Sequence, residues 1–385
     1  MKRIIVLGST GSIGASTLAV VRAMPGSFRV GGLACRRRAD RLAAQSAEFL
    51  PESVAIVDAA CRDALSAAVP IGTHLYTGSD AVLRMIQEVP ADIVVNGISG
   101  AAGLLPTMAA LRAGSSLALA NKESMVMAGR QVLAEAAVRG CRVLPVDSEH
   151  AALFSILGRQ DPSEVEELIL TASGGAFRSL SLDELSRVRF ADALRHPTWK
   201  MGAKITVDSA TMANKGLEVI EAQRLFGIAP PRIKVLIHPE SLVHSLVRTV
   251  DGTLHAEIST PDMRIPIQNA LTYPARTATP VEWLDLAQRS LTFQAVDARK
   301  YRMLDLAYSA ATSASAAHPI VYNAANEVAV ASFMDDAITF ANIPVIVEEA
   351  LSRDWSVLCD TIEGVLAVDA EARRFARECM KEFAA

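Results

Sequence analysis

Short apolar runs alternate with helix-type patterns over roughly the first third of the chain. The segment Ser12–Met24, for example, has the pattern of a helix that follows directly on an apolar run. Apolar strands that alternate with helices are typical of a parallel, doubly wound sheet. We therefore expect a Rossmann-like α/β domain at the N-terminus, with strands at Arg3–Leu7, Phe28–Ala34, Ser53–Asp58, Ile93–Asn96, Leu117–Ala120 and Arg142–Val146.

The pattern changes near Glu164 and predicts a central α+β domain. Ser241–Thr249 and Thr253–Ser259 flank the pair Asp251-Gly252. An Asp-Gly pair supplies the positive φ angles of a tight turn, so these segments predict an antiparallel hairpin. The C-terminal region is helical in pattern and ends in a helix expected at Ala370–Phe383, with Asp369 as its cap.

Composition and charge narrow the class of protein. Of the 385 residues, 51% are hydrophobic and 21% charged, which permits a large core and excludes wholesale disorder. The net charge of −4 argues against a nucleic-acid partner. No apolar run reaches the roughly 18 residues of a membrane helix, so no membrane partner is expected. The five scattered cysteines are typical of reduced thiols and predict a cytoplasmic protein.

Three glycines, Gly8, Gly11 and Gly14, lie between the first expected strand and the first expected helix. A loop here must turn tightly and let backbone N–H groups contact a pyrophosphate at a helix N-terminus, and glycine permits both. A plain turn is the alternative, because GxxGxxG is less specific than GxGxxG. The strand–helix alternation that follows favours dinucleotide binding.

The turn after the second expected strand is basic, with the sequence Cys35-Arg36-Arg37-Arg38. An NAD-binding unit usually places Asp or Glu here, on the ribose hydroxyls, whereas guanidinium groups pair with a 2′-phosphate. The alternative is a solvated basic turn. We expect NADP rather than NAD, bound by Arg36 and Arg37, because Arg38 lies further from the strand end and is expected to face water.

Acidic side chains follow the last expected strand of the N-terminal sheet, at Asp147-Ser148-Glu149. Residues i and i+2 of an extended segment point the same way, so both carboxylates are expected to converge on one cation. Oxygen ligands select Mg²⁺ or Mn²⁺ over zinc. The alternative is that Asp147 or Ser148 simply caps the apolar helix that follows.

Two further segments suit a phosphate group. Asp208–Glu218 combines hydroxyls, an amide and an ammonium group, and it ends in a candidate third carboxylate, Glu218. Thr171–Gly175 is a second strand-to-glycine turn. Each is also compatible with an ordinary loop.

Taken together, the motifs of this chain resemble those of the 1-deoxy-D-xylulose 5-phosphate reductoisomerase family. The resemblance extends over more than 300 residues, with the motifs in the same order. They are GSTGSIG at Gly8–Gly14, GAAGLLPT at Gly100–Thr107, ANKES at Ala120–Ser124, PVDSEH at Pro145–His150, SGG at Ser173–Gly175, HPTWKMG at His196–Gly202, VDSATMANKGLE at Val207–Glu218, HPESLVHSLV at His238–Val247, PDMR at Pro261–Arg264 and NAANE at Asn323–Glu327.

The resemblance implies an enzyme that binds NADPH and a divalent cation and acts as a homodimer. The family rearranges 1-deoxy-D-xylulose 5-phosphate and reduces the resulting aldehyde to 2-C-methyl-D-erythritol 4-phosphate, for isoprenoid biosynthesis. It also implies a division into an NADPH-binding domain, a catalytic and dimerisation domain, a linker and a C-terminal helical domain, at residues 1–147, 148–280, 281–303 and 304–385.

Residue roles carried over from the family fall into four groups. The cation ligands are Asp147, Glu149 and Glu218. Among the substrate-binding residues, Ser173, Ser209, Asn214 and Lys215 bind the phosphate group of the substrate, and Lys122 and Ser148 contact its other oxygens. His244 lies near the substrate, and His196 and Trp199 belong to a mobile flap. Catalysis is assigned to Lys122, Asp147, Glu149, Glu218, His196 and Trp199. The NADPH-binding residues are Gly8, Thr10, Gly11, Ser12, Ile13, Cys35, Arg36, Arg37, Asn121, Glu123, Met201, Gly202 and Met263.

The sequence departs from the family pattern at Cys35, where glycine is common, and at Ala176, where proline is frequent. Two alternatives stay open at this stage. One is another NADP-dependent dehydrogenase of a phosphorylated substrate, and the other is a non-enzymatic NADP sensor. The joint presence of Lys122, Asp147, Glu149 and Glu218 argues against both, because neither needs three acids beside a phosphate site.

Overall fold

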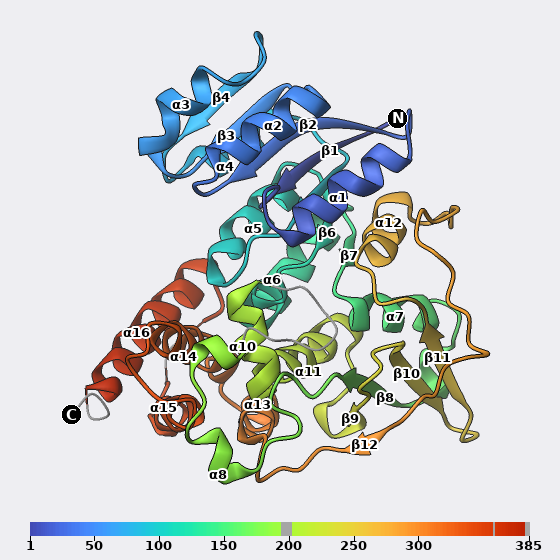
Figure 1. The fold of residues 1–385 in the computed structure, drawn as a ribbon, viewed down its shortest axis with the longest axis vertical. Helices are drawn as coiled ribbons and strands as arrows, with labels where there is room; N and C mark the ends of the chain where they lie inside the picture. The colour runs from blue at the N-terminus through green and yellow to red at the C-terminus, as the bar shows by residue number, and fades with distance from the viewer. Residues whose placement is uncertain (194–201, 357–358, 382–385) are drawn as a thin grey trace. The chain divides into compact units, whose positions relative to one another are not determined.

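The structure is a computed structural model that describes residues 1–193, 202–356 and 359–381. The chain packs as two compact units, each made of several stretches of sequence (Figure 1). Unit 1 comprises Met1–Ser124, Val132–Ala151 and Asp262–Glu282. Unit 2 comprises Met125–Gln131, Ala152–Pro261 and Trp283–Ala385.

Unit 1 contains a parallel sheet with the strand order β4-β3-β2-β1-β5-β6-β7. Ile4, Ile5 and Val6 of the central strand are fully buried, as expected for a strand that is covered on both faces. The predicted N-terminal α/β class is therefore confirmed. The strands are β1 (Lys2–Leu7), β2 (Phe28–Cys35), β3 (Ser53–Ile56), β4 (His74–Thr77), β5 (Ile93–Asn96), β6 (Ser116–Leu119) and β7 (Val143–Pro145).

Helices connect these strands, and one helix joins them from much later in the sequence. That helix is α12 (Arg264–Thr272), which packs on α1, β6 and β7 of the same unit (Figure 1). The others are α1 (Ser12–Ala23), α2 (Ala39–Phe49), α3 (Arg62–Ser66), α4 (Ala81–Glu88), α5 (Leu104–Arg112), both ends of α6 (Lys122–Arg139) and the first turn of α7 (Ser148–Leu157).

Unit 2 contains a mixed sheet with the strand order β11-β10-β8-β9-β12. Strands β10 and β11 pair in the antiparallel direction across Asp251-Gly252, and Gly252 has a φ of 86°, so the predicted hairpin is confirmed. The buried core of this unit includes Leu168, Val219 and Val247. The strands are β8 (Val165–Ala172), β9 (Ile233–Ile237), β10 (Val243–Thr249), β11 (Leu254–Ile258) and β12 (Gln294–Ala295).

Unit 2 includes the middle of α6 and the last part of α7. Its other helices are α8 (Leu182–Leu185), α9 (Phe190–Ala193), α10 (Ala203–Thr211), α11 (Ala213–Phe226), α13 (Arg302–Thr312), α14 (His318–Met334), α15 (Asn342–Ser352) and α16 (Ile362–Met380). The last helix begins earlier than predicted. Thr361 is its cap, because the Thr361 side chain accepts a hydrogen bond from the Gly364 N–H. Asp369 lies inside the helix and forms an ion pair with Arg373 instead, so the predicted cap is wrong.

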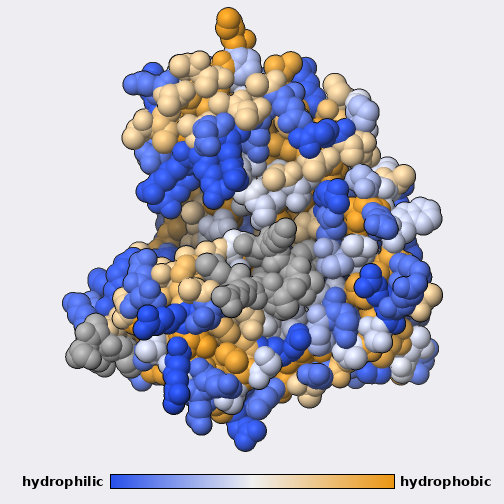
Figure 2. Space-filling model, viewed as in Figure 1, coloured by the Kyte–Doolittle hydropathy of each residue, from blue (hydrophilic) through white to orange (hydrophobic). Residues whose placement is uncertain are grey.

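The molecular surface mixes hydrophilic and hydrophobic side chains on the face that Figure 2 draws, with blue hydrophilic residues interrupted by smaller orange patches. Among the helices of the described residues, none combines the length and the apolar character that a membrane crossing requires.

Candidate active site

The glycine loop of unit 1 follows β1 at the point where the strand order changes direction, between β1 and β5. Ligands of open parallel sheets bind at such points. Gly8 has a φ of 71°, and a Cβ there would lie 2.7 Å from the Gly97 carbonyl oxygen. A Cβ at Gly14 would lie 2.3 Å from the Ser9 Cα. Close backbone packing therefore requires glycine at both positions. Gly11 and Ser12, at the start of α1, are exposed.

The basic turn after β2 has three exposed arginines in three different environments. Arg37 forms an ion pair with Asp58, with 3.2 Å between its Nε and the carboxylate. Arg38 is exposed, as expected, and it also donates a hydrogen bond to the Thr10 carbonyl oxygen of the glycine loop (3.3 Å). Arg36 is exposed at the strand end. Cys35 is buried, and burial raises the pKa of its thiol to about 11.

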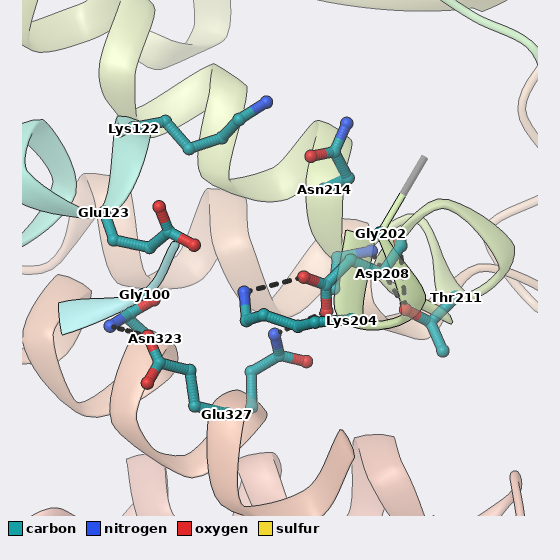
Figure 3. A network of polar contacts seen from close by, with 12 residues as sticks. Gly100, Lys122, Glu123, Gly202, Lys204, Asp208, Thr211, Asn214, Asn323 and Glu327 are labelled. Carbon is teal, nitrogen blue, oxygen red and sulfur yellow. Dashed lines mark hydrogen bonds and ion pairs between the residues drawn. The ribbon is translucent and has the colours of Figure 1, made fainter. Parts of the chain in front are cut away.

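The start of α6 is tied to the loop after β5. The Asn121 side chain accepts a hydrogen bond from the Ser124 N–H and so caps α6. It also donates to the carbonyl oxygens of Ile98 (2.6 Å) and Gly100 (2.9 Å). This arrangement fixes the backbone on both sides of Lys122 and Glu123, two buried charged residues at the start of the helix (Figure 3).

The acidic segment after β7 is helical rather than extended. The Asp147 carbonyl oxygen accepts the first hydrogen bond of α7, from the Ala151 N–H (2.8 Å), and Glu149 lies in the first turn. The predicted extended geometry is therefore wrong, and Asp147 occupies the cap position that was the alternative. The Asp147 carboxylate forms an ion pair with Lys122. Ser148 Oγ donates to Glu149 Oε2 at 2.5 Å.

Asp147 is ionised in this environment. Burial, the largest single effect, raises the pKa of its carboxyl group, but the Lys122 ammonium, His150 and a hydrogen bond with Glu149 together outweigh burial and hold that pKa well below its usual value. His150, which is fully buried, lies with its Nδ1 3.9 Å from Asp147 Oδ1.

The phosphate-type motifs meet inside unit 2. The loop Ser173–Gly175 follows β8, and a Cβ at Gly175 would lie 2.6 Å from both the Ser209 carbonyl oxygen and the Ala210 Cα. The backbone after Ser173 therefore lies directly against α10 at Ser209. Met212, which joins α10 to α11, has the left-handed φ of 64°.

Helix α11 brings two of the expected phosphate residues to the expected third carboxylate. Glu218 is fully buried. Its Oε1 accepts a hydrogen bond from Asn214 Nδ2 at 2.6 Å, and Lys215 forms an ion pair with the other oxygen. Because these residues lie three and four positions before Glu218, one face of the helix gathers all three side chains.

His244 of β10 is a neutral side chain in this unit. Its Nε2 lies 2.9 Å from Ser259 Oγ. Burial lowers the pKa of His244 to about 4, and the charges of His238 and Lys215 act in the same direction, whereas the Ser259 contact raises it in part. An uncharged imidazole can donate or accept a hydrogen bond without adding charge near a phosphate.

The remaining predicted site residues fall into three cases. His196, Trp199 and Met201 lie outside the described residues. Gly202 precedes α10, and its carbonyl oxygen accepts from the Thr206 N–H and Oγ1. Met263 caps α12 and so belongs to unit 1, with the glycine loop.

Asp208 and Asn326 are buried polar residues that the sequence did not single out. The carboxylate of Asp208 accepts from Asn326 Nδ2 at 2.8 Å, between α10 and α14. Both residues lie in motifs quoted above, VDSATMANKGLE and NAANE. The signal that could have found them is a polar side chain on the apolar face of a helix.

Three family models match the chain. The model described as 1-deoxy-D-xylulose 5-phosphate reductoisomerase matches residues 4–129, its C-terminal domain matches 143–226, and the DXP reductoisomerase C-terminal domain matches 258–375. The 1-deoxy-D-xylulose 5-phosphate reductoisomerase of Bacteroides fragilis is 43% identical over 98% of this chain and 97% of its own length. That of Shouchella clausii is 45% identical over 97% and 99%.

Solved structures resemble the chain over nearly its whole length. A crystal structure of DOX-P reductoisomerase in complex with NADPH, fosmidomycin and magnesium has a TM-score of 0.92 and 39% identity, covering 99% of this chain and 98% of that chain. The 1-deoxy-D-xylulose 5-phosphate reductoisomerase of Zymomonas mobilis in complex with NADPH has a TM-score of 0.91 and 40% identity, covering 98% and 99%.

Proposed function

Because this chain belongs to the 1-deoxy-D-xylulose 5-phosphate reductoisomerase family, we propose that it converts 1-deoxy-D-xylulose 5-phosphate to 2-C-methyl-D-erythritol 4-phosphate. The observation that supports the proposal is the arrangement of the site motifs within each unit. The dinucleotide loop has close contacts that demand glycine. In unit 2, Asn214 and Lys215 contact one buried carboxylate, Glu218, and the backbone after Ser173 lies against Ser209.

NADPH is the proposed cofactor, held by the glycine loop and the basic turn. Gly11 and Ser12 present the N-terminus of α1, which suits a pyrophosphate. Arg36 and Arg37 lie at the end of β2, where a 2′-phosphate is expected. Asp58 partly neutralises Arg37, so Arg36 is the stronger candidate of the two. Thr10, Ile13, Asn121 and Glu123 complete the proposed contacts, with Met201, Gly202 and Met263 near the nicotinamide.

A divalent cation, Mg²⁺ or Mn²⁺, is the second proposed cofactor, held by Asp147, Glu149 and Glu218. The donors fit such an ion, because all three are carboxylates and Asp147 is held ionised. When bound, the cation supplies Lewis acidity at the carbonyl and the adjacent hydroxyl oxygen of the substrate, and NADPH supplies the hydride. Lys122, which pairs with Asp147, is proposed to stabilise negative charge that develops on these oxygens.

The substrate's phosphate group is proposed to bind Ser173, Ser209, Asn214 and Lys215. These residues offer two hydroxyls, an amide and an ammonium group, and charge-assisted hydrogen bonds from such groups are strong. Neutral His244 adds a hydrogen-bonding group of unit 2 near this anion. Ser148 is proposed to contact substrate oxygens, and His196 and Trp199 are proposed to close over the substrate and exclude water from the aldehyde.

We propose that the chain divides by function at the boundaries expected from the sequence. This division differs from the two units described above, which are defined by which residues pack together. Residues 1–147 would bind NADPH, 148–280 would carry catalysis and dimerisation, 281–303 would link, and 304–385 would form the C-terminal helical part. None of the five cysteines forms a disulfide in the part of the chain that the structure describes, which supports the proposed action in the cytoplasm.

The proposed assembly is a homodimer formed through β11. This strand lies at the edge of the mixed sheet, where backbone groups are open to another strand. Leu254 and Ile258 on β11 are 45% and 37% exposed, which suits an apolar partner surface. A second copy of the chain offers the same edge.

An assay of NADPH oxidation tests the function. With 1-deoxy-D-xylulose 5-phosphate and Mg²⁺, we expect the absorbance of NADPH to fall and 2-C-methyl-D-erythritol 4-phosphate to appear, and a chelator should stop both. Oxidation of NADPH without a rearranged carbon skeleton would instead support the simpler NADP-dependent dehydrogenase. Replacing Glu218 with Gln should lower turnover and leave NADPH affinity unchanged, whereas the exposed Glu349→Gln on α15 should change neither.

A further inference from the structure

Asp208 is a buried carboxylate at the centre of a polar contact between two helices of unit 2 (Figure 3). Its Oδ2 accepts a hydrogen bond from Lys204 Nζ at 2.7 Å, one turn earlier on α10. Its Oδ1 accepts from Asn326 Nδ2 of α14 at 2.8 Å. Asn326 is fully buried and Asp208 is 1% exposed. A buried carboxylate is stable only when it is paired and hydrogen-bonded, so both contacts are needed.

Helix α14 makes a second contact, one turn before Asn326. A Cβ at Gly216 of α11 would lie 2.5 Å from the Tyr322 hydroxyl oxygen and 2.6 Å from the Ala307 Cβ of α13. Tyr322 is fully buried, and its hydroxyl donates to the Met303 carbonyl oxygen at 3.0 Å. One face of α14 therefore supports α10 through Asn326 and α11 through Tyr322.

These two supports lie on either side of the α10–α11 junction. Asp208 directly precedes Ser209, and Gly216 directly follows Lys215. Between them Met212 has a φ of 64°, which costs free energy in a residue other than glycine and persists only where the surroundings impose it. The junction carries Ser209, Asn214 and Lys215, so its conformation sets the spacing of these three side chains.

Helix α14 is itself fixed from the other side. Glu327, the residue after Asn326, forms an ion pair with Arg373 of α16 at 2.7 Å. Arg373 also pairs with Asp369, and these carboxylates raise its pKa above the usual value although burial opposes this. Helix α14 is thus tied to α16 through Glu327 and to α10 through Asn326.

We propose that Asp208 and Asn326 are positioning residues for the phosphate group of the substrate. Neither needs to touch the substrate. The Asn326–Asp208 contact holds the end of α10 in register with α11, so that Ser209 meets the same anion as Asn214 and Lys215. This inference rests on the proposed function, because it takes the anion to be the phosphate of 1-deoxy-D-xylulose 5-phosphate.

The test, made in the full-length chain, first turns the attractive Asn326–Asp208 contact into a repulsive one and then restores the attraction with a second substitution. Asn326→Asp places two carboxylates against each other, so we expect the KM for 1-deoxy-D-xylulose 5-phosphate to rise about tenfold or more, because small misplacements of binding groups are costly. The KM for NADPH should stay within about twofold of wild type, since a shift of α10 does not alter the glycine loop. Adding Asp208→Asn reverses the donor and acceptor, and should recover most of the lost affinity.

Asn323→Asp is the matched control on the same helix. Asn323 is also fully buried, and its Nδ2 donates to Glu327 Oε1 at 3.2 Å, so this change also places two acids together. It should lower the thermal unfolding temperature to a similar degree without raising the KM for substrate. An equal rise in KM for Asn323→Asp and Asn326→Asp, or a double variant no better than Asn326→Asp, would overturn the proposal.

Two further measurements keep the test decisive. If Asn326→Asp does not fold, Asn326→Ala replaces it; this variant removes the hydrogen bond to Asp208 without adding a charge. An unchanged KM for substrate in Asn326→Ala would also refute the inference. If the wild-type chain does not oxidise NADPH with this substrate, the proposed function fails instead, and calorimetric binding of inorganic phosphate to wild type and variants still tests the positioning role.

Discussion

At the scale of single residues, three acids with little exposure to solvent are each paired with a lysine. Lys122 pairs with Asp147, Lys204 with Asp208, and Lys215 with Glu218. An unpaired carboxylate in the protein interior would be strongly destabilising, so each lysine allows its acid to be buried in the absence of any cation. Two of these lysines, Lys122 and Lys215, are also the ones proposed to bind substrate oxygens and the phosphate group.

The preference for NADPH is testable at Arg36 and Arg37. A charge-assisted hydrogen bond contributes roughly 1.5–3 kcal/mol, so one good contact to the 2′-phosphate should favour NADPH over NADH by about ten- to a hundredfold, less a discount for solvent exposure. Replacing both arginines with Ser should lower the ratio of kcat/KM for NADPH to that for NADH towards one. It should also flatten the salt dependence of NADPH binding.

The control for this prediction is the exposed Arg62→Ser on α3, which removes a charge without touching the turn after β2. A large NADPH/NADH ratio that survives the double substitution would place the source of the preference elsewhere. Arg38, which binds the glycine loop, would then be the next residue to replace.

The stability of the unliganded protein should depend on the protonation of His244. Its pKa is about 4 in the folded state, lowered by burial from the usual 6.5, so the unfolded chain takes up a proton first as pH falls. The contribution is fully present above pH 6.5 and is lost as pH falls towards 4. At about 1.4 kcal/mol per pH unit, the loss is roughly 3 kcal/mol.

Urea unfolding at several pH values between 7 and 4 measures this dependence. His244→Gln should reduce the slope of the unfolding free energy with pH in that window. An identical slope in the variant would show that other groups cause the loss of stability.

At the scale of elements, the conformation of the loop between β1 and α1 requires glycine at some positions but not at others. Gly14→Ala would force a Cβ to within 2.3 Å of the Ser9 Cα, so the loop must move. We expect the NADPH dissociation constant to rise about a hundredfold or more, because the backbone N–H groups lose their alignment. Gly11→Ala is the matched change, since Gly11 has a φ of −84° and its Cβ would meet only the Gly8 carbonyl oxygen at 3.2 Å.

Fluorescence titration with NADPH distinguishes the two variants. Gly11→Ala should stay within about tenfold of wild type. If Gly14→Ala binds NADPH as well as Gly11→Ala does, close backbone packing is not what this loop requires.

Elements with a simple periodicity could be predicted from the sequence, whereas their ends and distant contacts could not. Strands β1 and β5 were expected almost to the residue, because a buried parallel strand is a continuous apolar run. The start of α7 was misjudged, because two acids around a serine suit an extended segment and a helix cap equally. The Asp208–Asn326 contact joins residues 118 positions apart, and no local pattern specifies it.

At the scale of the whole molecule, the β11 edge should control assembly. Leu254→Glu together with Ile258→Glu places charges on the proposed apolar partner surface, so the chain should become a monomer of 41.0 kDa. Light scattering coupled to gel filtration measures the mass. Ile71→Glu, at a fully exposed position in unit 1, should leave the mass of the wild-type assembly unchanged. A wild-type chain that already has the monomer mass at micromolar concentration would refute the homodimer.

The Lys215–Glu218 pair also has a consequence for how the binding of one ligand affects the affinity for another. Lys215 neutralises Glu218, so an ammonium group that is drawn to a phosphate leaves its carboxylate with a full, uncompensated charge. That charge then attracts a cation more strongly, and a cation on Glu218 in turn releases Lys215 for the anion. On the proposed function, cation and phosphorylated substrate therefore bind with positive heterotropic linkage. By thermodynamic reciprocity, each tightens the binding of the other by the same factor.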